Sequence, residues 1–352
     1  MTHDWLLVET LGAEPAVVAQ GQHTEDLVPV SAFLRRNPNL MAIQTAINET
    51  VQAGKPLSSL TPKSDRVIRT EVVQMTDGRI HGVHVWIGTL DEDPPDRVLP
   101  GPLKWDLTNR VATDTPESLM NGGLDPSAEA TQGRAFAEDL PARPLSAREA
   151  EVLSAAIKPV AGRAFCTTWD VADFKGRPIT VGFVARVLEE PDDSGRTGLI
   201  CRAMNWRGVR ADTAAPRDRG QSLLDDHPRP GVHRALVDLQ TWKLIRWLDE
   251  PCPFFDWRDQ RDGQPIVHPD DGPEMAAMTI DFDTGEASRV LRLRTEDGDW
   301  TPIHVTLHRV DVGEDAPAGL LSLRLPRPDE DEPRPRKVTR RARARAERAA
   351  RH

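Results

Sequence analysis

RVLRLRTEDGDWTPIHVTLHRV, the sequence of residues 289–310, predicts two strands joined by a tight turn. Asp297-Gly298 at its centre is a strong hairpin signal between two such runs. After the turn, residues 303–307 alternate between apolar and polar side chains, which indicates a strand with one buried and one solvated face. The stretch therefore predicts an antiparallel sheet as the basis of the fold.

The sequence on either side completes a module over residues 230–326. Its other predicted elements are strands at 233–239, 242–248 and 320–325 and a helix near 272–282. Asp270 or Asp271 is expected to cap this helix, because Asp is a favoured N-cap residue. The module is therefore an antiparallel sheet with a helix beside it.

The N-terminal segment, residues 1–95, repeats this logic. Its predicted strands are 5–10, 16–20, 67–75 and 80–90, the last two joined by an Asp77-Gly78 turn. A helix between the two strand pairs is predicted to start at Asn37 as N-cap and to stop at Gly54. Arg-Val-Ile-Arg at 66–69 is echoed by Arg-Val-Leu-Arg at 289–292, which suggests a duplicated architecture.

Residues 101–225 predict a mixed middle module. Ser146 and Glu149 form a capping-box pattern, so a helix is expected from Ser146 to just before Pro159. The expected strands are 164–172, 179–188 and 198–206. Proline-rich stretches at 91–102 and 207–230 are interpreted as linkers, and 327–352 as a disordered charged tail.

Several phrases carry a family resemblance. The third segment resembles a PAS sensor domain through Val267-His268-Pro269-Asp270-Asp271 and the strand–turn–strand that follows it. The chain as a whole resembles a family of uncharacterised actinobacterial proteins with tandem PAS–GAF–PAS-like sensor domains and no output domain. The resemblance spans about residues 4–326, omits the tail, and rests on the phrases DWLLVETLG at 4–12, GPLKWDL at 101–107, RAFAEDLP at 134–141 and AMNWR at 203–207.

This resemblance implies an α+β protein with three sensor-type modules, each an antiparallel sheet flanked by helices. They would be PAS-like over 1–95, GAF-like over 101–225 and PAS-like over 230–326. The resemblance brings no established ligand. It implies a separate effector protein, because no output domain follows, and a homodimer as one oligomeric state.

The amino-acid composition excludes several classes of protein. The 352 residues are 38% hydrophobic, enough for packed cores, and no stretch approaches the roughly 20 apolar residues of a membrane helix. The first eight residues lack the basic start of a secretory signal, so we expect a cytoplasmic protein with no membrane contact. Cys166, Cys201 and Cys252 stand too far apart for a disulfide framework or a C-x-x-C zinc site.

Charge is distributed unevenly. Residues 333–352 contain nine Arg or Lys and one Glu, a local charge of +8, so with a total of −10 the rest of the chain carries −18. A body this acidic repels phosphate, and nucleic acid is therefore an unlikely partner except through the tail. The simpler interpretation of the tail is a solvated charged segment.

The histidine pairs do not predict a metal site. His304 and His308 lie on a predicted strand, where four residues separate them by roughly 13 Å. His81 and His84 are three apart on a strand and face opposite sides. The sequence also lacks a phosphate-binding loop, a G-x-S-x-G elbow and any acid–base or nucleophile set, so no catalytic residue and no cofactor is assigned.

Aromatic residues are the most suggestive group, with nine Trp, eight Phe and no Tyr. Those of the third segment could line an apolar ligand pocket. They could equally be core residues, as could Trp105, Trp169 and Trp206 of the middle segment. The candidate ligand-binding residues are Trp242, Trp247, Phe254, Phe255, Trp257 and Trp300.

The sequence favours a non-enzymatic sensor or adaptor that binds a small molecule or a protein and signals to a separate effector. Three sensor-like modules without an output module carry this expectation. Two alternatives stay open, a ligand-free interaction scaffold and a nucleic-acid-associated protein acting through its basic tail.

Overall fold

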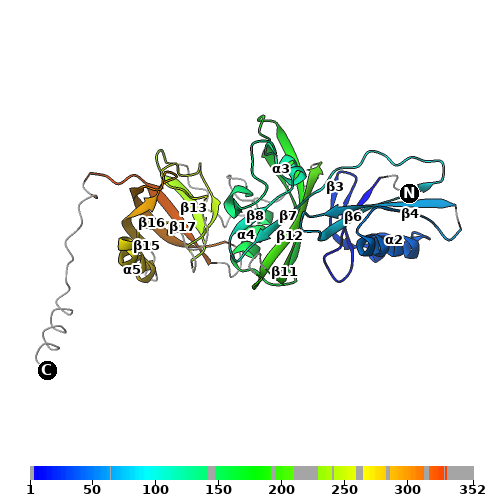
Figure 1. Cartoon of the computed structure of the whole chain (residues 1–352), viewed down its shortest axis with the longest axis horizontal. Helices are drawn as coiled ribbons and strands as arrows, with labels where there is room; N and C mark the ends of the chain where they lie inside the picture. Colours follow the sequence, from blue (N-terminus) through cyan, green and yellow to red (C-terminus); the bar gives the residue numbers. More distant parts are fainter. Residues whose placement is uncertain are drawn as a thin grey trace, which may run out of the picture.

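The structure, a computed structural model, describes residues 4–63, 65–140, 147–191, 195–209, 229–239, 242–258, 265–282, 286–312, 317–328 and 330. The chain folds as an α+β protein of three modules, each built on one antiparallel sheet. The modules follow one another along the longest axis of the molecule (Figure 1). No helix among these residues is long and apolar enough to cross a bilayer.

The first module is a six-stranded sheet in the order β3-β2-β1-β6-β5-β4. Its strands are β1 (Leu6–Glu9), β2 (Ala16–Gln20), β3 (His23–Pro29), β4 (Leu57–Leu60), β5 (Arg66–Gln74) and β6 (Ile80–Thr89), with a short helix α1 (Val30–Phe33) and a long helix α2 (Leu40–Ala53). The four predicted strands are present. β3 and β4 were not predicted, since one is largely polar and the other has only four residues.

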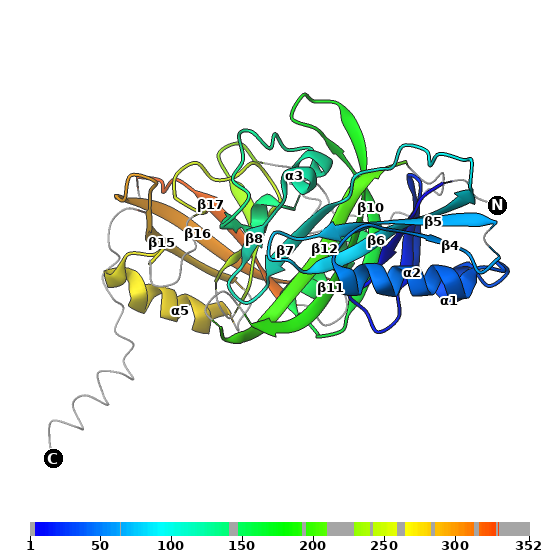
Figure 2. The same cartoon turned by 45° about the vertical axis from the view of Figure 1, so that its right-hand side comes forward.

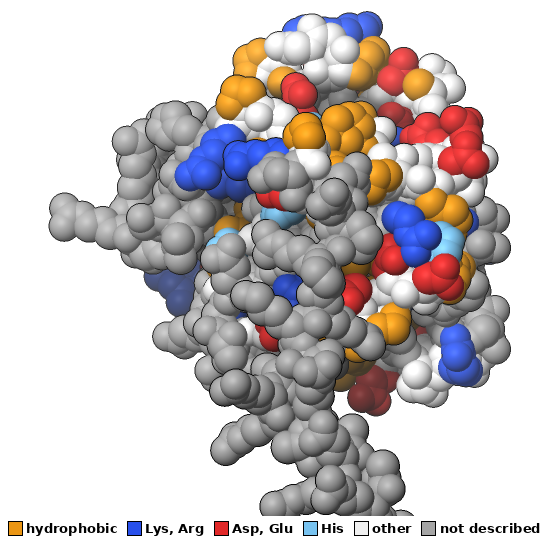
Figure 3. Space-filling model, turned by 90° about the vertical axis from the view of Figure 1, so that its left-hand side faces the viewer, with side chains coloured by type: hydrophobic (Ala, Val, Ile, Leu, Met, Phe, Trp, Pro, Cys, Tyr) orange, Lys and Arg blue, Asp and Glu red, His pale blue; other side chains and the backbone are white. Residues whose placement is uncertain are grey.

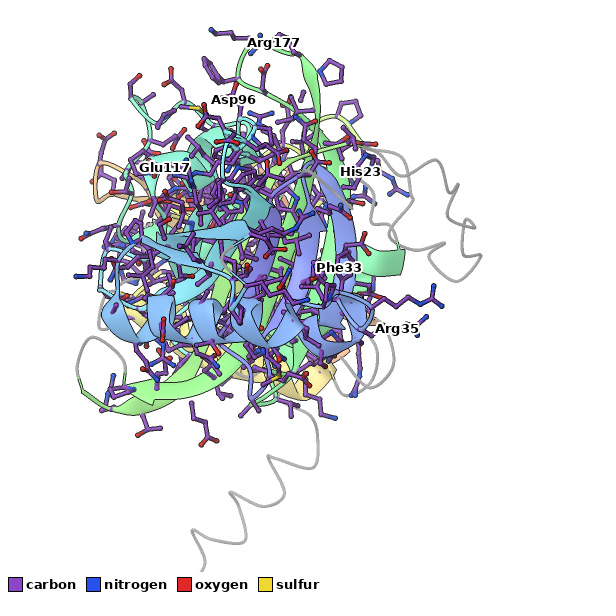
Figure 4. The ribbon with its side chains drawn as sticks, turned by 90° about the vertical axis from the view of Figure 1, so that its right-hand side faces the viewer. His23, Phe33, Arg35, Asp96, Glu117 and Arg177 are labelled. Atoms are coloured by element: carbon purple, nitrogen blue, oxygen red, sulfur yellow. The ribbon has the colours of Figure 1, made fainter. Side chains whose placement is uncertain are left out.

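Helix α2 covers one face of this sheet, as Figures 2 and 4 show. Ile43 and Ile47 are buried in one core cluster with strand residues. The helix ends at Gly54, in the left-handed conformation predicted for its stop. It begins later than predicted, with Asn39 at the N-cap, because Asn37 accepts a hydrogen bond from the Asn39 backbone and holds the entering chain in a turn.

The middle module has a six-stranded sheet in the order β10-β11-β12-β7-β8-β9. The strands are β7 (Gly101–Asp106), β8 (Val111–Thr113), β9 (Arg134–Ala135), β10 (Ala164–Ala172), β11 (Pro178–Pro191) and β12 (Thr197–Gly208), and the helices are α3 (Pro116–Gly122), the short 3-10 helix η1 (Phe136–Glu138) and α4 (Ala147–Ile157).

The three strands predicted for the middle module, and most of its helix, are confirmed. The expected cap Ser146 lies outside the described residues. β7, β8, β9 and α3 were missed, because all four are short and β7 and α3 also contain glycine and proline. β7 in fact begins inside the predicted linker 91–102, and most of the second predicted linker lies outside the described residues.

The third module is a five-stranded sheet in the order β14-β13-β17-β16-β15. Its elements are β13 (His233–Val237), β14 (Leu244–Trp247), the 3-10 helix η2 (Pro269–Asp271), α5 (Gly272–Phe282), β15 (Glu286–Arg294), β16 (Trp300–Asp311) and β17 (Pro317–Arg324). All predicted elements are present. The Asp271 carboxylate binds Arg292 of β15 at 2.6 Å, which ties the start of α5 to the sheet. Figure 3 shows side chains of both charges interspersed on this end of the molecule.

The three sheets share one arrangement of strands. In each module the first strand lies between the second and the last: β1 between β2 and β6, β7 between β8 and β12, and β13 between β14 and β17. The sequence echo does not mark equivalent strands, however. β5 pairs with the last strand of its module, whereas β15 pairs with β16, the last but one.

Polar contacts fasten the first module to the middle one. His81 of β6 contacts the Ala203 carbonyl through Nδ1 at 2.9 Å and Arg202 through Nε2 at 3.2 Å. Burial lowers the pKa of His81 to about 4, so the ring is neutral near pH 7. A bidentate pair between Glu9 and Arg186 lies nearby, at 2.8 and 3.1 Å. The two sheets are thus fixed against each other by paired, buried groups.

The middle and third modules share apolar packing. Leu236, Ile245 and Val310 of the third module belong to the same core cluster as Phe136 of the middle module. At the edge of this contact Arg110 pairs with Asp238 of the third module, the Nη2–Oδ2 distance being 2.8 Å. The middle module is therefore in close contact with both neighbours.

Candidate functional site

A cavity of about 200 Å³ lies in the middle module, beside its sheet and α3. Three aromatic rings form much of its wall, from three different strands. Trp105 stacks on Phe183 with ring centroids 5.2 Å apart, and Trp169 tilts against Phe183 at 4.8 Å. Apolar residues from the same strands, from α3 and from the loop after it also line the cavity: Leu103, Leu119, Leu124, Val171, Ala172 and Val181.

The local sequence explains how α3 comes to border the cavity. Thr115 caps the helix and Ser118 returns the bond, a capping box with Pro116 at the first position. The helix lies so close to β7 that a Cβ on Gly101 would come within 2.1 Å of the Ser118 backbone nitrogen. At its other end Gly123 takes a positive φ of 93°, which turns the chain at the cavity wall.

Three carboxyl groups form the polar side of the cavity. Asp114, Glu138 and Asp139 all line it, and one buried guanidinium, that of Arg134, pairs with all three. Arg134 Nη1 lies 2.8 Å from Asp114 Oδ2 and also binds Asp139 Oδ1, while Nε lies 3.3 Å from Glu138 Oε2. The cluster therefore holds more carboxyl groups than buried cations.

The two aspartates interact strongly. Burial, followed by the neighbouring Asp114 carboxylate, raises the pKa of Asp139 to about 8. Burial also raises the pKa of Asp114, against the lowering effect of Arg134. The two aspartates therefore share one proton at neutral pH, because two buried carboxylates on one guanidinium resist double ionisation. Perturbed carboxyl groups of this kind are enriched at functional sites.

Asn205 of β12 contributes an unused acceptor to the lining. The residue is 7% exposed, and its Nδ2 donates to the Ser118 carbonyl at 2.9 Å, which fixes the orientation of the amide. Its Oδ1 is buried and finds no hydrogen-bond partner among the described residues. A buried acceptor without a donor is costly unless something supplies the missing hydrogen bond.

The six aromatic residues predicted as a ligand site lie elsewhere, in the third module. Five of them pack in or against one core cluster: Trp242, Trp247, Phe254, Phe255 and Trp257. Trp247 is 2% exposed and its ring contacts those of Phe255 and Trp257. Trp300 lies apart and packs on His268 at 4.8 Å. None of the six lines the cavity of the middle module, and their binding role stays a prediction.

Sequence reasoning missed the carboxyl cluster. Asp114 stands in a stretch without a regular pattern, while Glu138 and Asp139 lie within RAFAEDLP, the phrase at 134–141 that carries the family resemblance. Trp105 likewise lies in GPLKWDL at 101–107. The sequence feature that could have indicated the site is therefore that charged and aromatic residues occur together in those phrases.

Two elements connect the cavity to the neighbouring modules. On η1 and the residue before it, Ala135 and Ala137 join the core cluster of the third module, while Glu138 lines the cavity. On β12, Asn205 lines the cavity while its neighbours Met204 and Trp206 pack into a cluster shared with the first module.

The comparisons with known proteins identify a family. Models of the Rv3651-like N-terminal, middle and C-terminal domains match residues 4–96, 99–208 and 217–333. The chain belongs to this three-domain family. It is also similar to an uncharacterised protein of known crystal structure from Mycobacterium tuberculosis, with 55% identity over 94% of this chain and 98% of that one and a TM-score of 0.84.

Two further solved structures resemble this chain only weakly, with TM-scores below 0.5. An RNA-binding light-oxygen-voltage receptor is 12% identical over 64% of this chain and 95% of its own, with a TM-score of 0.25. The periplasmic sensory domain of the Campylobacter jejuni chemoreceptor Tlp1 is 12% identical over 67% of this chain and 75% of its own, with a TM-score of 0.21. The search of curated proteins finds no match.

Proposed function

We propose that the protein is a non-enzymatic cytoplasmic sensor that binds a small molecule in the cavity of its middle module and signals to a separate effector. In this proposal the modules are PAS-like, GAF-like and PAS-like. One observation carries it: Asn205 Oδ1, a buried acceptor without a partner, belongs to a residue that lines a cavity with aromatic walls and perturbed carboxyl groups. A bound molecule that displaces the lining around Asn205 would supply the missing donor.

The arrangement favours binding over catalysis. A general acid or base needs an oxygen that can reach the reacting atom. Both oxygens of Asp139 already accept hydrogen bonds, Oδ2 from Trp105 Nε1 at 2.6 Å and Oδ1 from Arg134. Asp114 is held in the same way, by Ser118 and Arg134. The two aspartates are thus held as part of the wall, while Glu138 is paired more weakly.

The contacts with both neighbours supply a route for signalling. A ligand that moves η1 would shift Ala135 and Ala137 in the core of the third module. A ligand that moves β12 would shift Met204 and Trp206 against the first module. A close-packed contact of this kind has few intermediate arrangements, so a small displacement at the cavity would change the packing at both contacts.

The ligand-free scaffold is a second candidate, favoured by the third module. There the predicted ligand residues fill the space with their own side chains, Trp247 being 2% exposed. In that case the sheet faces of the modules would recruit partners. The third alternative, nucleic-acid binding through the basic tail, concerns residues outside those described.

Native mass spectrometry of the full chain, purified gently from an actinobacterial host, tests the proposal. We expect an extra mass that is released on denaturation. Gly122→Leu should abolish it, because a Cβ at Gly122 would have Asn205 Nδ2 as its nearest neighbour at 3.9 Å and the longer side chain would occupy the cavity. Gly272→Leu is the matched control, since that glycine faces open space.

A clean unliganded mass for the wild-type chain, across growth phases of the host, would overturn the sensor proposal in favour of the scaffold. An extra mass that survives in Gly122→Leu would place the ligand outside this cavity. Thermal unfolding of both variants checks that the middle module still folds.

A further inference from the structure

We propose that the cavity of the middle module takes a small organic cation, a protonated amine on a flat or aliphatic apolar body. This inference rests on the proposed function and names the chemical class of its ligand. Four properties of the cavity support this inference. They are the unused hydrogen-bond acceptor, the excess of carboxyl groups, the aromatic lining and the volume.

The hydrogen-bonding capacity of the lining calls for a donor. Three side-chain donors in the wall are already used: Trp105 Nε1 on Asp139, Ser118 Oγ on Asp114, and Asn205 Nδ2 on the Ser118 carbonyl. The acceptor Asn205 Oδ1 is unused, and each carboxylate oxygen can accept more than one hydrogen bond. A ligand rich in N–H groups satisfies this wall, whereas a ligand with acceptors alone does not.

The charge of the lining calls for a cation. Because Asp114 and Asp139 share a proton at neutral pH, two negative charges in this group of acids stand against the single buried guanidinium of Arg134. A second cation, Arg258, reaches Glu138 only from the surface, at 3.8 Å and with more than half of its side chain exposed. Glu138 is the acid with the weakest pairing in the cluster and also lines the cavity, so it is the expected partner of the ammonium group.

The aromatic lining suits the body of such a ligand. Trp169, the partly exposed ring of the three, can attract a cation and offers apolar surface, and it is backed by Phe183, which stacks on Trp105. The volume of about 200 Å³ exceeds the roughly 150 Å³ of an engineered cavity that binds benzene. A single ring or a short branched chain with an ethylamine arm is therefore the expected size.

A metal ion fits less well. Among the described residues no group of three acidic, histidine or cysteine side chains is placed to hold one. The reason is visible in the cluster itself, because Asp114 and Asp139 both converge on Arg134 Nη1. The position between these two carboxylates is already occupied by a cation.

The test uses three probes of one shape on the full chain, measured by isothermal titration calorimetry: phenethylamine, phenethyl alcohol and 3-phenylpropionate. Isoamylamine and isoamyl alcohol form the aliphatic pair. We expect at least one amine to bind ten-fold or more tightly than its alcohol, and the carboxylate not to bind. Gly122→Leu should abolish this binding and Gly272→Leu should leave it unchanged.

Two variants examine the charge of the wall. Glu138→Gln should weaken amine binding ten-fold or more while leaving the alcohol unaffected. Glu117→Gln is its matched control, since Glu117 is an exposed carboxylate on the same helix as Ser118 and Figure 4 shows it at the periphery. Thermal unfolding of each variant separates a loss of binding from a loss of folding.

The pH dependence of amine affinity provides a second test of the proposed cation site. Asp139 faces Asp114, Arg134 and Trp105, with Glu138 next to it in sequence, and its pKa is raised to about 8 by burial and by Asp114. An arriving ammonium group would lower its pKa and release the proton. Because binding then releases a proton, amine affinity should rise from pH 6 to pH 8, and Asp139→Asn should remove that rise.

The outcomes separate the two proposals. If alcohol or carboxylate probes bind as tightly as the amines and Gly122→Leu removes them, the cavity binds ligands but the cation inference is wrong. If no probe binds, the molecule found by native mass spectrometry decides: a natural ligand with an amine supports the inference, and one without an amine overturns it. A chain without bound probe and without natural ligand contradicts both proposals.

Discussion

The aromatic residues of the middle and third modules have different neighbours. In the third module, tryptophan and phenylalanine rings contact one another and close the core, and Trp247 is 2% exposed. In the middle module, Trp105 and Phe183 are just as buried, but Trp169 packs on Phe183 and stays partly exposed, and three carboxyl groups line the same cavity. An aromatic cluster borders a cavity where its neighbours are carboxyl groups, because charged groups do not pack into an apolar core unless they are paired.

The largest loss of stability is expected when Arg134 is substituted. Arg134→Met leaves buried Asp114 and Asp139 without their shared cation, so it should destabilise the chain by about 3–5 kcal/mol. Arg177→Met is the control. Its side chain is 68% exposed at the periphery of Figure 4, and the buried Asp173 carboxylate that it pairs with keeps the backbone N–H groups of Lys175 and Arg177, so Arg177→Met should cost less than Arg134→Met. Urea unfolding followed by circular dichroism measures both; equal losses would refute the view that the acidic wall depends on Arg134.

Truncation of an aromatic residue should have a different effect in each of the two modules. Trp247→Ala removes a buried core ring and should cost about 3–5 kcal/mol of unfolding free energy, with no effect on ligand binding in the middle module. Trp169→Ala alters a partly buried ring in the cavity wall and should cost less stability, while reducing the affinity for the amine probes about ten-fold. Loss of ligand in Trp247→Ala with the fold retained would move the binding site to the third module.

The acidic wall also gives stability a pH signature. The pKa of Asp139 is raised to about 8 in the folded chain, from an ordinary value of 3.8. Between these values the folded state holds a proton that the unfolded state has lost, so stability falls as pH rises from 4 to 8. Asp139→Asn should therefore lack this fall and become more stable than wild type at pH 8. Unfolding temperatures of the two proteins across this range test it; parallel curves would contradict the raised pKa.

The smallest loss of stability is expected when Trp300 is substituted. This ring lies outside the aromatic cluster and makes an edge-on contact with His268. Trp300→Ala should cost about 0.5–1.5 kcal/mol beyond the loss of buried area and leave ligand binding unchanged. A ten-fold loss of affinity for a natural ligand would restore Trp300 to the candidate site.

Regular patterns made most of the fold predictable. The alternating strand 300–311 and the helix 272–282 were predicted because side-chain periodicity reports which face is buried. Short elements such as β8 and β9 carry no such period, and they depend on the strands beside them. The α2 start shifted because two asparagines compete for the cap, and a local turn at Asn37 decides between them.

The site was less predictable than the fold. Its acids come from the β8–α3 connection and from η1, its acceptor from β12, and no spacing in the sequence links these positions. The aromatic count drew attention to the third module, where the rings satisfy one another. Only the three-dimensional structure reveals that Asn205 Oδ1 lacks a donor, because that depends on the position of the Ser118 carbonyl.

The shared strand arrangement has a consequence for how such chains can be built. Because the first and last strands of each module are antiparallel neighbours, the chain enters and leaves at the same end of the sheet: Leu6 lies opposite Val85, Gly101 opposite Asn205, and His233 opposite Leu323. A unit whose two ends lie side by side can be inserted or removed as a single genetic cassette, leaving the sheets before and after it intact. Recombination could therefore exchange the middle module of such a chain while keeping its flanking modules.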